Sequence, residues 1–151
     1  MGKAHCRARW VSAYRAQSVH SDLLLVDDSH VVRTGGANES VAAAWTLIPD
    51  HAGSYKWVWS CEADILCPPD SLARLIEHAG LKEADMVAAF YPHRGQPGFI
   101  AALGCTLMTG DLASRIGTYV KDVWCSAESA ALRLPTHRVT LDGLGLAHID
   151  G

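Results

Sequence analysis

The chain has 151 residues, of which 49% are hydrophobic and 19% are charged, so a folded domain with its own core is expected rather than a disordered chain. Its formal net charge of −3 gives no reason to expect nucleic acid or an anionic membrane as a partner. The sequence has no run of about 18 apolar residues, so we expect no transmembrane helix. The simplest organisation is one domain over residues 1–151.

The cysteines are five in number and widely spaced, which favours reduced thiols over a disulfide framework. No apolar stretch of the kind found in a secretory signal occurs near the first residue, so we expect a cytoplasmic protein. Cys61 and Cys67 could share a zinc ion. Their spacing, however, is wider than that of the usual zinc knuckle, and two prolines follow the second cysteine.

The first half of the chain alternates between predicted helices and strands. Residues 1–20 predict a helix, and the apolar run at 23–26 is typical of a strand buried on both faces. After a glycine-containing loop, Asn38 is a favourable N-cap for a helix that should end near Pro49. The aromatic segment 57–61 predicts the second strand.

The second half continues the alternation. Asp70 or Ser71 should begin a helix that ends at Gly80. The remaining predicted elements are strands over residues 85–90 and 99–108, helices over 111–116 and 126–134, and strands over 138–141 and 144–149. This order predicts an α/β fold with a mostly parallel central sheet and helices on both faces.

Acidic residues follow two of the predicted strands. Glu62 and Asp64 are two apart, so on an extended chain they point to the same side, roughly 6.6 Å apart, and could bind one Mg²⁺ or Mn²⁺. Taken alone, such a pair is more often a solvated strand end before a helix. Asp27 and Asp28 could accept hydrogen bonds from a nucleobase or a ribose, but they are also common turn residues.

Three further positions could carry chemistry. His148 lies on the last apolar strand and could bind a metal through a ring nitrogen, although a packed histidine is more common. Arg94 follows His93 in a loop and could meet phosphate, although a solvated loop is the simpler interpretation. Glu128 begins a predicted helix, where the dipole favours its ionised form, so it could act as a general base or only as part of a cap.

The order of five segments resembles the nucleotide-sugar-binding half of a family 2 glycosyltransferase with the A-type fold. The similar motifs are Val-Asp-Asp-x-Ser, a Glu-x-Asp in place of Asp-x-Asp, Pro-Pro-Asp-x-Leu, Gly-Cys-x-Leu and a late histidine. The segments that carry them are residues 25–29, 38–45, 59–75, 85–94 with 103–108, and 145–150.

The resemblance implies a Rossmann-like sheet and transfer of a sugar from a nucleotide-diphosphate donor to a hydroxyl acceptor, with inversion as the expected outcome. It implies Mn²⁺ or Mg²⁺ as cofactor and Glu128 as catalytic base. The residues that it places at the nucleotide sugar are Asp27, Asp28, Asn38 and Glu62. Those that it places at the cation are Glu62, Asp64 and His148.

The chain departs from the family pattern in three ways. The metal motif begins with Glu, Glu128 is followed by Ser129 where the family has a second acid, and the family's first strand is not visible in residues 1–21. A non-catalytic nucleotide-sugar-binding domain, or a truncated remnant, is therefore the alternative. A third hypothesis is an interaction module whose interface anchors would be Trp10, Trp57, Trp59 and Trp124.

Overall fold

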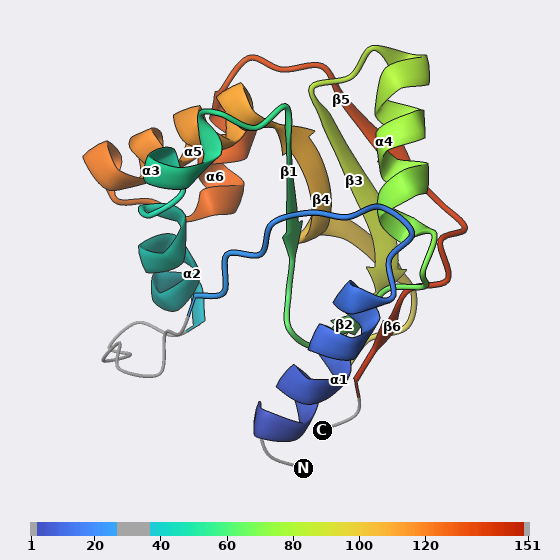
Figure 1. The fold of residues 1–151 in the computed structure, drawn as a ribbon. Helices are drawn as coiled ribbons and strands as arrows, with labels where there is room; N and C mark the ends of the chain where they lie inside the picture. The colour runs from blue at the N-terminus through green and yellow to red at the C-terminus, as the bar shows by residue number, and fades with distance from the viewer. Residues whose placement is uncertain (1–2, 27–36, 150–151) are drawn as a thin grey trace. The chain divides into compact units, whose positions relative to one another are not determined.

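The computed structural model of the chain describes residues 3–26 and 37–149, which form two compact units. The sheet unit contains Met1–Ser21, Trp59–Leu107 and His137–Gly151, and the helical unit contains Asp22–Val58 and Met108–Thr136 (Figure 1). The expected α/β class is confirmed. The single domain over residues 1–151 stays a prediction. None of the helices in the described stretches is both long and apolar enough to cross a bilayer.

A four-stranded mixed sheet has most of its residues in the sheet unit. Its strands are β1 (Trp57–Cys61), β3 (Met86–Pro92), β4 (Phe99–Thr109) and β5 (Arg138–Leu141), and their spatial order is β1-β4-β3-β5 (Figure 1). β3 and β5 run parallel, with Met86 opposite Arg138. β3 and β4 are antiparallel neighbours, because only the short turn over residues 93–98 connects them. The His93 N–H closes this turn by donating to the Gly98 carbonyl at 2.9 Å.

β3 supplies the centre of the core. Met86, Val87, Ala88 and Ala89 are fully buried, as expected for a strand covered on both faces. The amphipathic helix α4 (Ser71–Lys82) packs against β3 and β5. Its buried residues lie on one face at helical spacing: Leu72, Leu75 and Ala79.

The predicted end of α4 at Gly80 is wrong, because the helix continues to Lys82. Glu83 then adopts a left-handed conformation, with φ 50°, and its N–H donates to the Gly80 carbonyl. The N–H of Ala84 donates to the Ala79 carbonyl at 2.9 Å. These two bonds form a Schellman motif, and burial of the Ala84 side chain completes it, so the helix needs no glycine at this end.

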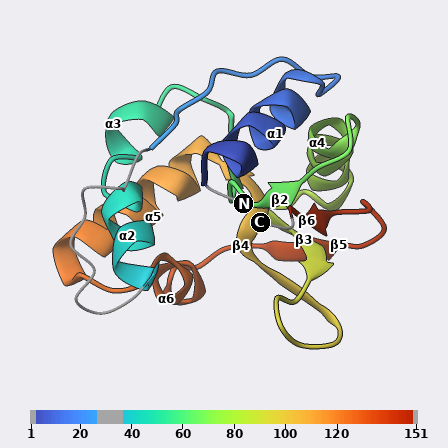
Figure 2. The same ribbon diagram turned by 90° about the horizontal axis from the view of Figure 1, so that it is seen from below.

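A second, two-stranded sheet lies beside the first within the same unit. β2 (Ile65–Leu66) pairs antiparallel with β6 (Ala147–His148), and α1 (Lys3–Arg15) packs against β2, as Figure 2 shows from below. α1 confirms the helix expected near the N-terminus. The last predicted strand, residues 144–149, is reduced to the two residues of β6.

The helical unit is organised around α5 (Gly110–Val123), which packs against α2 (Ala37–Trp45), α3 (Pro49–Ala52) and α6 (Ala127–Arg133). α5 is longer than the expected segment 111–116 because its buried face continues through Gly117 to Val120. Gly117 permits close approach: a Cβ there would lie 2.6 Å from the Trp45 carbonyl oxygen. Pro49 begins α3 at its first turn and does not end the helical region.

Two further expectations need correction. Residues 23–26 form no strand, and the side chains of Leu23, Leu24 and Leu25 are 42–46% exposed. A short apolar run has no period from which a paired strand can be recognised, so the sequence alone overstated its burial. Asn38 is not the N-cap, since α2 begins at Ala37. Asp27 and Asp28 lie outside the described residues.

Candidate functional site

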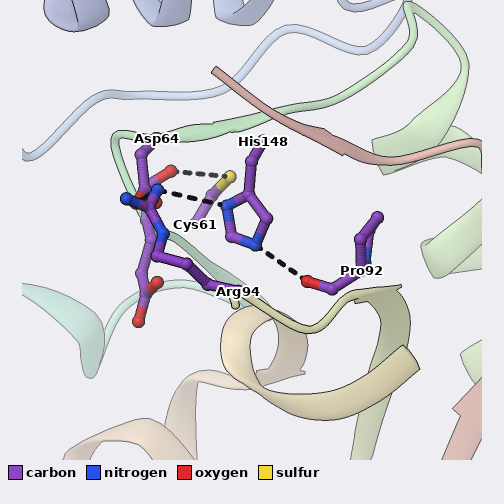
Figure 3. A network of polar contacts seen from close by, with 6 residues as sticks. Cys61, Asp64, Pro92, Arg94 and His148 are labelled. Carbon is purple, nitrogen blue, oxygen red and sulfur yellow. Dashed lines mark hydrogen bonds and ion pairs between the residues drawn. The ribbon is translucent and has the colours of Figure 1, made fainter. Parts of the chain in front are cut away.

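The pairing of β2 with β6 brings Asp64 and His148 together. Ile65 is opposite His148 in the ladder, and the Ile149 N–H donates to the Asp64 carbonyl at 2.7 Å. The turn that precedes β2 is closed by the Ile65 N–H bonding to the Glu62 carbonyl at 3.1 Å. Two residues that are far apart in sequence therefore present their side chains from adjacent backbone segments, as Figure 3 shows.

Arg94 joins these two side chains. Its Nη2 donates to Asp64 Oδ2 and lies 3.4 Å from His148 Nδ1 (Figure 3). Arg94 comes from the connection between β3 and β4, and its side chain is 65% exposed, against 35% for Asp64. This contact could not be predicted from the sequence, because the loop that carries Arg94 has the composition of a solvated turn.

The hydrogen bonds of His148 determine which ring nitrogen can accept. Nε2 lies 2.8 Å from the Pro92 carbonyl, which can only accept, so we assign the proton to Nε2. Nδ1 then carries the lone pair, on the side where Arg94 and Asp64 lie. Such a bond from the distal nitrogen to a carbonyl is the usual way in which proteins orient a metal-binding histidine.

Tyr91 supports the imidazole from the side. The Tyr91 and His148 rings meet edge to face, with centroids 6.0 Å apart and planes at 84°. Tyr91 fits against β4 only because residue 104 is glycine: a Cβ there would lie 2.5 Å from the Tyr91 hydroxyl oxygen. Gly104 therefore fixes the Tyr91 ring and, through it, the orientation of His148.

Asp64 retains one oxygen that fits a cation. Its Oδ1 is buried and has no hydrogen-bond partner among the described residues, although a buried carboxylate oxygen normally has one. One carboxylate oxygen and one imidazole lone pair form a mixed donor set, which suits Mn²⁺ better than Mg²⁺ with its preference for oxygen alone. Asp64 and His148 thus offer two candidate ligands, and their binding of the expected cation stays a prediction.

Glu62, the other predicted ligand, has an exposed side chain and is anchored through its backbone N–H to the Gly104 carbonyl at 2.9 Å. Its role at the cation or the nucleotide sugar stays a prediction. Glu128 lies in the first turn of α6, where the Ser126 side chain accepts from the Ser129 N–H. Glu128 and Asn38 belong to the helical unit, and their roles also stay predictions, as do those of Asp27 and Asp28.

Three cysteine thiols converge within the sheet unit. The Sγ atoms of Cys61 and Cys67 are 3.6 Å apart, and those of Cys67 and Cys105 are 4.0 Å apart. The structure therefore adds Cys105 to the pair considered from the sequence. Among the described residues, these are the three possible metal ligands whose donor atoms all lie within 4.8 Å of one another.

The thiols influence one another's ionisation. Hydrogen bonding with Cys105 and burial raise the pKa of Cys61 and of Cys67. The neighbouring thiols of Cys61 and then Cys67 hold the pKa of Cys105 well below its ordinary value.

A hollow of about 320 Å³ lies in the helical unit along α5, between residues such as Arg115, Tyr119 and Leu134. No predicted site residue lines it.

Comparison of the chain with protein-family models, with curated protein sequences and with solved structures found no match.

Proposed function

We propose that the chain is a metal-dependent glycosyltransferase of the A-type that transfers a sugar from a nucleotide-diphosphate donor to a hydroxyl acceptor. The observation that carries the proposal is the meeting of Asp64 and His148 across β2 and β6, with one buried carboxylate oxygen lacking a donor. The parallel pair β3–β5 and the helix α4 packed on it support the α/β part of the expected fold. The sheet as a whole is mixed and does not show the mostly parallel order that the sequence predicted.

Asp64 and His148 would hold the divalent cation through Oδ1 and Nδ1, with Glu62 contributing directly or through water. The bound cation supplies Lewis-acid neutralisation of the leaving diphosphate. Arg94 donates to Asp64 and faces His148, so it lies beside both residues that would hold the cation. Its exposed guanidinium would donate to the diphosphate oxygens, for which its planar geometry is suited.

In the chemical step, the acceptor oxygen forms a bond to the anomeric carbon as the bond from that carbon to the diphosphate oxygen breaks. The Glu128 carboxylate takes the acceptor proton, and attack opposite the leaving group gives inversion. Asp27, Asp28 and Asn38 would hold the nucleoside and ribose of the donor. These assignments follow the sequence resemblance.

The direct test is turnover with a panel of nucleotide-sugar donors in the presence of Mn²⁺, scored as donor hydrolysis or transfer. Asp64→Ala should lower the rate by roughly 10²–10³-fold, the scale observed when one group that stabilises developing negative charge is removed. The matched control is Asp111→Ala, which removes an 83% exposed carboxylate in an i,i+4 pair with Arg115 on α5. If the Asp64 and Asp111 variants turned over equally fast, the proposed role of Asp64 would be wrong.

The second candidate is a domain that binds a nucleotide sugar without transferring it. It is favoured by Ser129, which stands where the family has a second acid and is engaged in the cap of α6 through Ser126. Calorimetric binding of a nucleoside diphosphate without turnover across many acceptors would support this candidate. The interaction-module hypothesis is weaker, because Trp10 is buried and cannot serve as a surface anchor.

A further inference from the structure

The three converging thiols come from three separate backbone segments of the sheet unit. Cys61 ends β1, Cys67 follows β2, and Cys105 lies inside β4. Cys67 and Cys105 are buried, and Cys61 is half-buried. The proximity of the three thiols does not follow from a local sequence motif, because Cys105 is 38 residues from Cys67.

The spacing of the sulfurs suits a shared cation. A zinc ion bound at about 2.3 Å by thiolates places pairs of sulfurs roughly 3.8 Å apart in a tetrahedron and roughly 4.0 Å apart in a plane. The observed separations are 3.6 Å between Cys61 and Cys67 and 4.0 Å between Cys67 and Cys105. A disulfide would instead need one pair to approach to about 2.05 Å.

Indole N–H groups are arranged around the sulfurs. Trp10 Nε1 donates to Cys61 Sγ at 3.4 Å, and Trp10 itself is buried. Trp59 Nε1, in the same unit, is buried and has no hydrogen-bond partner among the described residues. Donors of this kind offset the negative charge of thiolates that are withdrawn from water.

We propose that Cys61, Cys67 and Cys105 bind one thiophilic d¹⁰ cation of the zinc class, with water as the fourth ligand on the half-buried side of Cys61. Binding replaces the thiol protons, which pass to solvent, so no oxidant or reductant is required. The ion would also fix both ends of the segment that carries Glu62 and Asp64. Three thiols would bind such an ion whether or not the chain transfers sugar. The simple alternative is that buried cysteines pack as small apolar side chains.

The test is titration of the reduced, chelator-treated full chain with Cd²⁺ and with Co²⁺, followed by sulfur-to-metal charge-transfer absorption. The experiment uses a chain in which Cys6 and Cys125 are replaced by serine, so that only the three thiols remain. We expect one ion per chain and the same affinity as in the unmodified chain. Cys105→Ser in this background should weaken binding at least 100-fold and reduce the charge-transfer intensity by about a third.

A second variant guards against loss of folding. Trp10→Phe removes the N–H donor to Cys61 and keeps a ring that can stack on Tyr14, whose centroid is 5.8 Å from that of Trp10. It should weaken Cd²⁺ binding about 10-fold, as outer-shell changes do, with an unchanged circular dichroism spectrum. Absence of charge-transfer absorption in the parent, or equal affinity in the parent and in folded Cys105→Ser, would overturn the proposal.

Discussion

The segment between Cys61 and Cys67 separates two regions of opposite chemistry in the sheet unit. On one side the thiols gather in the interior; on the other, Asp64 and His148 meet at a partly exposed edge together with Arg94. The buried region offers soft sulfur ligands, and the exposed region offers oxygen and nitrogen. The comparison shows that one short segment can present two donor sets that different cations would distinguish by softness.

The largest expected effect separates the two regions by metal preference. His148→Gln removes the imidazole lone pair and should weaken Mn²⁺ binding by about 100-fold. Loss of a direct ligand should cost at least as much affinity as the largest outer-shell changes, which reach about 100-fold. Cd²⁺ binding at the cysteines should change by less than about twofold. Calorimetric titration of both ions checks this, and electron paramagnetic resonance can follow Mn²⁺ alone. A parallel loss of both ions would show that the two regions are a single site.

Gly104→Ala should disturb both regions, because its Cβ would contact Tyr91 at 2.5 Å and Ile65 at 3.0 Å. We expect a loss of about 1–3 kcal/mol in the free energy of unfolding, as in other overpacked cores. Chemical denaturation measures it. The control is Gly80→Ala within α4, where a Cβ meets nothing within 4 Å, and a gain of up to about 1 kcal/mol is expected. Equal stability of the two variants would contradict the fixed position of Tyr91.

Arg94→Ala should affect the exposed region alone. Removing the guanidinium that shares Asp64 with the cation should tighten Mn²⁺ binding about three- to fivefold, consistent with an exposed ion pair worth up to about 1 kcal/mol. Affinity for a nucleoside diphosphate should fall, because a phosphate donor is lost. Weaker Mn²⁺ binding in this variant would mean that Arg94 supports the cation site and does not compete with it.

The smallest expected effect lies in the helical unit and involves neither the cysteine cluster nor the Asp64–His148 pair. The Tyr55 hydroxyl donates to Asp22, and this bond with the Asp22 charge raises the pKa of Tyr55. The associated stability is therefore fully present below the unfolded pKa of about 10 and is lost as the pH rises through the folded value. Spectrophotometric titration should show one tyrosine ionising at a lower pH in Asp22→Asn than in the parent. No such change should occur in Asp50→Asn.

Much of the fold could be predicted because the local patterns agreed with the final packing. β1 and α4 combine a clear period with a recognisable start, and β4 was predicted to within one residue. Residues 23–26 failed because an unbroken apolar run carries no period that distinguishes a paired strand from an exposed segment. α5 was predicted too short, over residues 111–116, whereas Gly117 continues the helix and permits close contact with the Trp45 carbonyl.

The residues of the candidate sites also include some that the sequence could indicate and some that it could not. Asp64 and His148 could be proposed because each lies at the end or in the middle of an apolar strand, where a polar side chain is conspicuous. Their Arg94 partner could not, since no local pattern predicts a contact across 30 residues. Cys105 was equally hidden: nothing near it in the sequence indicates the sulfurs of Cys61 and Cys67, and only the pairing of strands brings them together.

The central claim is that Asp64 and His148 hold a divalent cation that receives a diphosphate. The most direct measurement is calorimetric binding of a panel of nucleoside diphosphates, with and without Mn²⁺, to the parent, Asp64→Asn and the control Asp111→Asn. We predict binding that requires Mn²⁺, falls at least tenfold in Asp64→Asn and is unchanged in Asp111→Asn. Diphosphate binding that needs no divalent cation, or that is equal in all three chains, would contradict the claim.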